Sequence, residues 1–341
     1  MKAAFVTDVE KVEVKEIDKP VISDTEVLIR TKTVGICGSD LHLFRGTHPF
    51  RHAPAVLGHE IAGEVVEAGK LVTRFKIGDW VTVEPQVGCG TCEMCARGFV
   101  SLCAKKKVPG TPKWVGAFSE YFNAEEAVVY PLAEGISYEI GTLAEPLAVA
   151  VHTINHARTK SGALVILGAG TIGQLILIFA KLKGYSPIIV TDTVEFNRTF
   201  AMEHGADAAF NPTIDDVPAE VKKLTGGGAD LAIVAAGADN ILDQACESVH
   251  KCGEVGIVAM ITKKIPFYSY GVVFNEIDIY GAMCYEPKDF AEAVELINSR
   301  QLELEDYVTQ VEASLDKTQE GLDILNQKKE NVVKVIIRVA E

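Results

Sequence analysis

The segment ALVILGAGTIG, residues 163–173, constrains the fold of this chain more than any other stretch. It is a short apolar run that passes through closely spaced glycines into a stretch with helical periodicity. Further apolar runs alternate with helical stretches after it, at 187–192, 231–237 and 253–260. This alternation predicts an α/β fold in which crossover helices connect the strands of a parallel sheet.

The glycines of this segment predict a dinucleotide site. They allow a tight turn, close approach of the backbone to a pyrophosphate and close packing of helix on strand, while the helix N-terminus offers free N–H groups to the phosphates. The pattern alone is weak, but the preceding strand, the following helix and an acid nineteen residues later at Asp192 agree with it. The predicted turn residues are Gly168, Gly170, Thr171, Ile172 and Gly173.

Asp192 predicts NAD rather than NADP as the cofactor. Its carboxylate is expected to accept hydrogen bonds from the adenosine ribose hydroxyls and to repel a 2′-phosphate. Arg198 is a further candidate cofactor residue, close enough in sequence to weaken this preference, although an arginine on a helix surface is the more ordinary interpretation.

Four of the eight cysteines lie within fifteen residues, and the first three are spaced two residues apart in CGTCEMC. Such spacing lets successive thiolates turn toward one tetrahedral zinc ion, which would be structural because no position remains for water. The alternative is a loop of free thiols. The predicted ligands are Cys89, Cys92, Cys95 and Cys103.

A second, open metal site is suggested by ligand types earlier in the chain. Cys37 lies in GICGSDLH and His59 in GHE, while Glu60 and Glu145 offer carboxylates. Three protein ligands and a water would make a catalytic zinc site. The residues alone leave this open, since a lone cysteine is usually a small core residue and a lone histidine is more often structural.

Composition restricts the class of protein. A chain of 341 residues suggests two domains. The net charge of −14 and the lack of a long basic run exclude nucleic acid as an expected partner. The first residues, MKAAFVTDVEKVEV, lack the apolar stretch of a secretion signal, so we expect a cytoplasmic protein. The longest apolar run, near 175–180, is too short to cross a membrane.

Taken together, these segments resemble the zinc-dependent medium-chain alcohol dehydrogenases along nearly the whole chain. The resemblance is carried by VGICGSDLH, VLGHEIAGEVVEAG, the four-cysteine segment, EPLAVAVH and VILGAGTIG. It implies a GroES-like, β-rich catalytic domain formed by 1–149 and 288–341, with a Rossmann NAD-binding domain inserted at 150–287. In that arrangement the tail returns to complete the N-terminal fold.

The resemblance also implies roles for individual residues. Cys37, His59 and Glu60 fall on catalytic zinc positions, so that each subunit would hold two zinc ions, one catalytic and one structural. Glu145 falls where polyol and threonine dehydrogenases have an acid and simple alcohol dehydrogenases commonly have a cysteine. Ser39 and His42 match the family's proton relay; outside this motif they would be read as a turn residue and a surface imidazole.

The expected function is transfer of a hydride between NAD and a secondary alcohol of a polyol, a diol or a related hydroxy compound, as in sorbitol, butanediol or threonine dehydrogenases. The alternatives are a zinc-free quinone reductase and a non-catalytic, NAD-sensing regulatory protein on the same fold. Proteins of the resembled family tend to form dimers or tetramers, and an edge strand is expected within 274–287. Both points predict a homo-oligomer, either a dimer or a tetramer.

Overall fold

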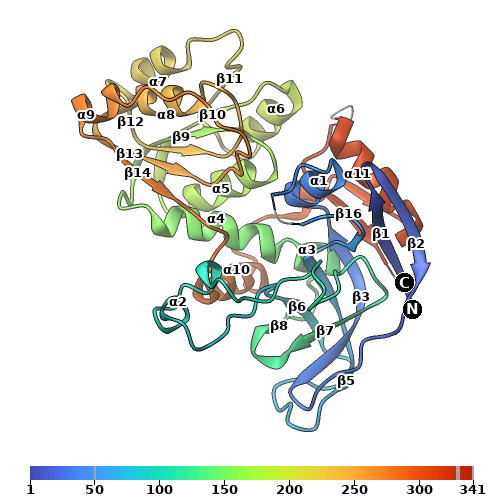
Figure 1. Ribbon diagram of the computed structural model, residues 1–341. Helices are drawn as coiled ribbons and strands as arrows, with labels where there is room; N and C mark the ends of the chain where they lie inside the picture. The colour runs from blue at the N-terminus through green and yellow to red at the C-terminus, as the bar shows by residue number, and fades with distance from the viewer. Residues whose placement is uncertain (50, 328–330, 340–341) are drawn as a thin grey trace. The chain divides into compact units, whose positions relative to one another are not determined.

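The strand Glu26–Gly35, β3, organises the part of the chain that carries the predicted metal ligands. The computed structural model describes residues 1–49, 51–327 and 331–339. Contacts divide the chain into two units, one made of Met1–Glu145 with Glu286–Glu341 and the other of Pro146–Tyr285. Each unit has its own sheets and helices (Figure 1).

In the first unit, β3 is buried along most of its length and pairs with three other strands. The main sheet has the order β15-β16-β3-β5-β6-β8, and β7 also pairs with β3. A smaller sheet has the order β2-β1-β4. The bounds are β1 Lys2–Asp8, β2 Lys11–Glu16, β4 Ala55–Val56, β5 Glu60–Ala68, β6 Trp80–Val83, β7 Tyr121–Glu125, β8 Val129–Pro131, β15 Gln310–Glu312 and β16 Val335–Arg338.

The C-terminal tail completes this sheet. The apolar run of β16 pairs antiparallel with β3, with Ile336 opposite Gly35, and its Val335 and Ile337 join the core that contains Phe44, Phe118 and Phe122. Short helices connect the strands: α1 Gly38–Phe44, α2 Glu93–Ala96, α3 Tyr138–Thr142, α10 Pro287–Asn298 and α11 Thr318–Gln327, with 3₁₀ turns at Val100–Leu102, Glu126–Val128, Glu305–Tyr307 and Leu315–Lys317.

The second unit is the predicted parallel sheet. Its strand order, β11-β10-β9-β12-β13-β14, is that of a doubly wound dinucleotide-binding fold. The strands are β9 Gly162–Leu167, β10 Tyr185–Thr191, β11 Ala208–Phe210, β12 Ala229–Val234, β13 Val249–Ile257 and β14 Asp278–Gly281. The helices are α5 Thr171–Leu182, α6 Glu195–Glu203, α7 Val217–Thr225, α8 Ile241–Ser248 and α9 Tyr270–Asn275, while α4, Ala144–His156, runs into this unit from the first.

Helices cover both faces of the sheet because its central strands are apolar on both faces (Figure 1). In β9, Val165 and Leu167 join a core cluster with Val217 and Val221 of α7. Ile166, which lies between them in the strand, is equally buried and points to the opposite face, as alternation along a strand requires. The strand β14 ends the sheet, as the sequence predicted for this segment.

Candidate active site and zinc-binding lobe

The four predicted zinc ligands come together in a lobe around the helix α2. The Sγ atoms of Cys89, Cys92, Cys95 and Cys103 all lie within 4.8 Å of one another. The Cys92 and Cys103 sulfurs are 3.7 Å apart, which is too long for a disulfide. Four sulfurs placed about 2.3 Å from a central zinc would be separated by roughly 3.8 Å. The donor set and its spacing therefore fit a structural zinc ion.

Backbone amides aim at these sulfurs. The Cys89 and Cys95 amides donate to the sulfurs of Cys103 and Cys92 at 3.5 Å each. Hydrogen bonds from the backbone and side chain of Thr91 lower the pKa of the Cys89 thiol to about 6, whereas burial raises the pKa of Cys95 to about 11. A cation at the centre would favour the thiolate form of all four.

Glu286, which was not predicted as a functional residue, binds the lobe to the rest of its unit by hydrogen bonds. Glu286, at the start of α10, accepts a hydrogen bond from the Val100 amide at 2.7 Å and another from the Ser101 hydroxyl at 2.6 Å. Its side chain is buried. In the sequence, Glu286 is distinguished only by its position just before a helix that has proline in its first turn. That position predicts a helix cap and gives no sign that Glu286 binds the cysteine lobe.

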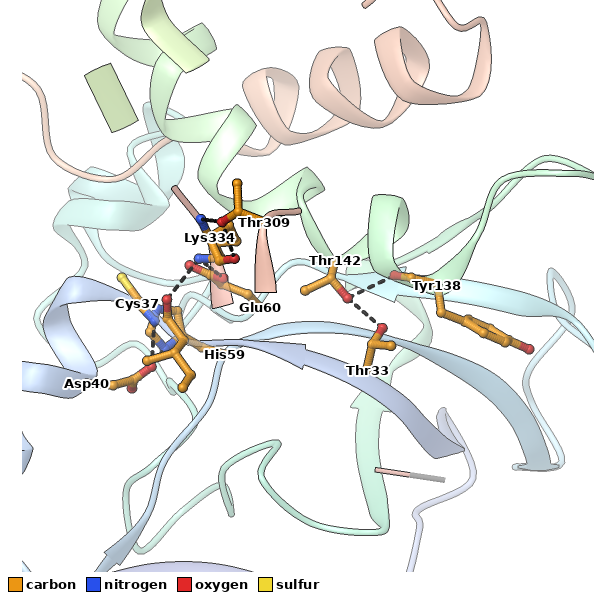
Figure 2. A network of polar contacts seen from close by, with 10 residues as sticks. Thr33, Cys37, Asp40, His59, Glu60, Tyr138, Thr142, Thr309 and Lys334 are labelled. Atoms are coloured by element: carbon orange, nitrogen blue, oxygen red, sulfur yellow. Dashed lines mark hydrogen bonds and ion pairs between the residues drawn. The ribbon is translucent and has the colours of Figure 1, made fainter. Parts of the chain in front are cut away.

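The second group of ligands is assembled by the pairing of β3 with β5. Gly35, the last residue of β3, lies opposite Glu60, the first residue of β5. Cys37 follows as the N-cap of α1, and His59 immediately precedes β5. Ligand atoms of Cys37, His59 and Glu60 consequently lie within 4.8 Å of one another (Figure 2). Thiolate, imidazole and carboxylate are a donor set that suits a zinc ion with an open position.

Asp40 orients the histidine of this group and was not among the predicted site residues. Its Oδ1 lies 3.5 Å from His59 Nδ1, and its Oδ2 accepts a hydrogen bond from the Cys37 amide at 3.0 Å (Figure 2). The contact with Nδ1 leaves His59 Nε2 to face a metal, as outer-shell carboxylates commonly do. The sequence placed an acid three residues after Cys37 but gave no sign of what it would touch.

The electrostatics of the group favour a positive charge. Burial opposes protonation of His59, yet attraction to Asp40 and Cys37 raises its pKa well above the usual value. Burial would raise the pKa of Asp40, but His59 lowers it overall. Within the described residues, Asp40 Oδ1 and Glu60 Oε2 are buried without a hydrogen bond and meet their partners only as ion pairs. A bound cation would satisfy these negative groups.

The other predicted catalytic residues lie in the same unit. Ser39 and His42 are three residues apart on α1 and hence on neighbouring turns of one face. His42 Nδ1 is 3.2 Å from the Thr47 hydroxyl. Glu145 is buried near the start of α4, but it does not belong to the group of ligand atoms within 4.8 Å.

The predicted nucleotide turn has the geometry that a pyrophosphate needs. β9 ends at Leu167, Gly168 has a φ of +107°, and α5 begins at Thr171. A Cβ on Gly173 would lie 1.9 Å from the Gly168 carbonyl oxygen, so only glycine permits this close packing. Gly170 provides no side-chain cap for α5, and this leaves first-turn amides for phosphate oxygens.

Asp192 lies beside this turn at the end of β10. Its Oδ2 accepts a hydrogen bond from the Ala169 amide at 2.9 Å, and its Oδ1 accepts one from the Val194 amide at 2.8 Å. Arg198 donates from Nη1 to the Asp192 carbonyl oxygen at 2.8 Å. The carboxylate is thereby fixed against the glycine turn, where a ribose is expected, and Arg198 lies next to it.

Comparisons with known proteins identify the family of this chain. Residues 23–134 match the family described as "Alcohol dehydrogenase GroES-like domain", and residues 171–299 match "Zinc-binding dehydrogenase". Sorbitol dehydrogenase of Bacillus subtilis is 34% identical over 99% of this chain and 97% of its own length. L-threonine 3-dehydrogenase of Pyrococcus furiosus is 32% identical over 96% of this chain and 95% of its own.

A solved structure, the 2R,3R-butanediol dehydrogenase of Bacillus subtilis, superposes with a TM-score of 0.91 at 31% identity and covers 99% of both chains. The chain therefore belongs to the zinc-dependent medium-chain alcohol dehydrogenases, in their polyol and threonine dehydrogenase branch. It is an NAD-dependent zinc oxidoreductase with a GroES-like and a Rossmann domain, which confirms the class predicted from the sequence. The comparisons give no support to a non-catalytic regulator.

Loss of one ligand is expected to affect the two candidate metal sites differently. Cys37→Ser should lower kcat/KM by more than about 100-fold, since changes to outer-shell partners alone cost 10–100-fold, and should leave the melting temperature nearly unchanged. Cys92→Ser should lower the melting temperature and remove one zinc, because zinc supplies folding free energy to such lobes. Metal analysis, melting curves and kinetics on both variants test this, with the exposed Cys252→Ser as a control. Equal loss of stability in the two variants would contradict the assignment.

Replacing Asp192 should reduce the preference for NAD. Asp192→Ala removes a charged acceptor worth about 1.5–3 kcal/mol per hydrogen bond, so the KM for NAD should rise roughly 10–100-fold while that for NADP rises less or falls. Asp207→Ala is the matched control, because Asp207 also accepts a backbone hydrogen bond, from Ile188 at 2.6 Å, but lies immediately before the neighbouring strand β11. If both variants change the KM for NAD and the KM for NADP to the same extent, the proposed role of Asp192 is wrong.

Proposed function

We propose that this chain oxidises a secondary alcohol of a polyol, a vicinal diol or a related hydroxy compound with NAD, at a zinc ion held by Cys37, His59 and Glu60. The observation that carries the proposal is the convergence of these three ligand atoms within 4.8 Å. Three protein ligands leave a position for an oxygen of the substrate, in contrast to the four thiols of the lobe, which we assign to a second, structural zinc.

Cys37, His59 and Glu60 would hold a zinc ion that would lower the pKa of an oxygen ligand, as zinc does for water from about 15.7 to about 7, and NAD would supply the hydride acceptor. Asp40 keeps the His59 ring oriented through Nδ1. The hydroxyl proton of the substrate passes to Ser39 Oγ and on to the ring of His42. Burial and then the charge of Arg45 lower the pKa of His42, so its ring is neutral near pH 7 and able to accept that proton.

Glu145 is proposed to act beside the ion rather than as one of the three converging ligands. It is buried and lies close in sequence to the end of α3, which contacts β3 and β5. A carboxylate in such a place can hold a water or a substrate hydroxyl by a hydrogen bond. The polyol and threonine dehydrogenases that resemble this chain make a polyhydroxy or hydroxyamino substrate the most direct hypothesis.

A substrate panel tests the reaction. With NAD, formation of NADH should be detected by absorbance for one or more of sorbitol, xylitol, 2,3-butanediol, L-threonine and aldonates, and Ser39→Ala and His42→Gln should lower kcat more than KM. Ser314→Ala serves as the control, because Ser314 lies before a 3₁₀ turn far in sequence from the ligands. Absence of NADH formation across the panel by zinc-loaded protein would reject the proposal.

We also propose that the chain forms a homo-oligomer through the edge of its parallel sheet. The edge strand β14 and the neighbouring α9 expose apolar side chains, including Ile279, Val273 and Phe274. Unpaired strand edges and exposed apolar groups favour association with a second copy. Light scattering should give a mass of at least twice 36.8 kDa, and Ile279→Lys should lower it. A wild-type particle of monomer mass would refute this assignment.

The proposed location is the cytoplasm. The two groups of thiol-containing ligands need a reducing compartment to stay available to metal, and cell fractionation checks the assignment. In the described parts of the chain, none of the helices has both the length and the apolar character that crossing a bilayer requires.

A further inference from the structure

Lys334 lies at the candidate catalytic group although it comes from the opposite end of the chain. It immediately precedes β16, and its side chain is 2% exposed. The Nζ atom donates to the Ile36 carbonyl oxygen at 3.0 Å and makes an ion pair with Glu60 Oε2 (Figure 2). One ammonium thereby joins the backbone next to Cys37 to the carboxylate of Glu60.

The surroundings hold this lysine in place. The Thr309 hydroxyl accepts hydrogen bonds from the Val333 and Lys334 amides at 2.8 and 3.1 Å and donates to the Lys334 carbonyl at 3.1 Å. A Cβ on Gly35 would lie 1.9 Å from Glu60 Oε2 and 2.8 Å from Lys334 Cε. The end of β3 is therefore glycine at the point where the ion pair needs the space.

Lys334 adds a positive charge to the buried charges around the candidate metal site. Cys37 as a thiolate, Glu60 and Asp40 contribute three negative charges, and a zinc ion contributes two positive charges. Lys334 supplies the third positive charge, and both it and Glu60 are almost completely buried. Buried charges are tolerated when they are paired and hydrogen-bonded, so this lysine is part of the electrostatics of the ion.

We propose that Lys334 is a positioning residue that keeps Glu60 a ligand through a single oxygen. Because the ammonium is paired with Oε2, it competes with a metal for that oxygen and favours binding of the ion through Oε1. A carboxylate that bound through both oxygens would fill the position that a substrate oxygen needs. Lys334 thus preserves the open coordination site, and this inference rests on the proposed catalytic role of Cys37, His59 and Glu60.

Cobalt replacement tests the role of Lys334 apart from turnover. Cobalt is loaded into the full-length protein in place of zinc, and the visible spectrum of Cys37→Ser, which retains only the four-cysteine site, is subtracted. In Lys334→Met the remaining bands should weaken, because a higher coordination number lowers cobalt d–d absorption. A chelator should also remove this cobalt more slowly, and kcat/KM should fall about 10-fold or more. Lys334→Arg should restore the cobalt spectrum, the rate of cobalt removal and kcat/KM toward their wild-type values.

The controls separate this role from a general effect of losing a lysine. Lys317→Met is the matched control, because Lys317 pairs with Glu320 at 2.5 Å on the surface, and it should leave the spectrum unchanged. If Lys334→Met does not fold, Lys334→Met in a Glu60→Gln background replaces the buried pair by neutral groups. That double variant should have the same cobalt spectrum as Glu60→Gln alone, since Lys334 acts through the carboxylate.

The outcomes are distinguishable. A Lys334→Met spectrum and chelation rate equal to wild type would overturn the role of Lys334 and leave the metal site intact. A double variant that differs from Glu60→Gln would also overturn it. A wild-type spectrum identical to that of Cys37→Ser would show that no cobalt binds at Cys37, His59 and Glu60, and would overturn the proposed catalytic site together with this inference.

Discussion

The antiparallel register of β3 is the constraint on which the candidate site depends. One neighbour, β5, places Glu60 opposite Gly35, and the other, β16, places Ile336 opposite the same glycine. A slip of one residue in either pairing would turn the side chains of that strand to the other face of the sheet. The burial of β3 on most of its positions, and of β16 along its apolar run, opposes such a slip. The hydrophobic core thus fixes the positions of the polar groups that form the candidate site.

The lobe that carries the four cysteines, unlike the sheet around β3, has little apolar burial. Its helix α2 has no buried residue, and three of its four cysteines are only half-buried, so apolar burial cannot hold the lobe in shape. A zinc ion held by the four thiolates, as we propose, would take the place of the missing core, as in other small metal-stabilised modules. The hydrogen bonds from Val100 and Ser101 to Glu286 then join the lobe to α10. The proposed metal and one buried carboxylate would together stabilise the lobe in the way that a hydrophobic core stabilises the rest of the unit.

The sequence predicted those parts of the structure that local patterns determine. The glycine turn needs only a strand, a bend and a helix in succession, and the four cysteines lie within fifteen residues, so spacing was enough for both. Asp40, Glu286 and Lys334 were missed because their importance depends on partners brought by strand pairing or helix packing. Lys334 in particular stands in an apolar run, where nothing distinguishes a buried partner of Glu60 from a lysine that points to solvent. Glu145 was selected by its residue type and by resemblance, and its role at the site stays a prediction.

Buried ionic groups of this kind are costly unless each has a partner, and this cost explains why the ligands form one connected network. Asp40 needs His59 and the Cys37 amide, and Glu60 needs Lys334. Lys334 is itself held in place, since its ammonium donates to the Ile36 carbonyl oxygen and its amide donates to the Thr309 hydroxyl. Removing any one member would leave another charge buried and unpaired. The resulting loss of folding free energy is far larger than the net stabilisation that any single pair provides. The network therefore resists piecemeal change: a substitution at Lys334 is tolerated best when Glu60 changes with it, even though the two residues lie at opposite ends of the chain.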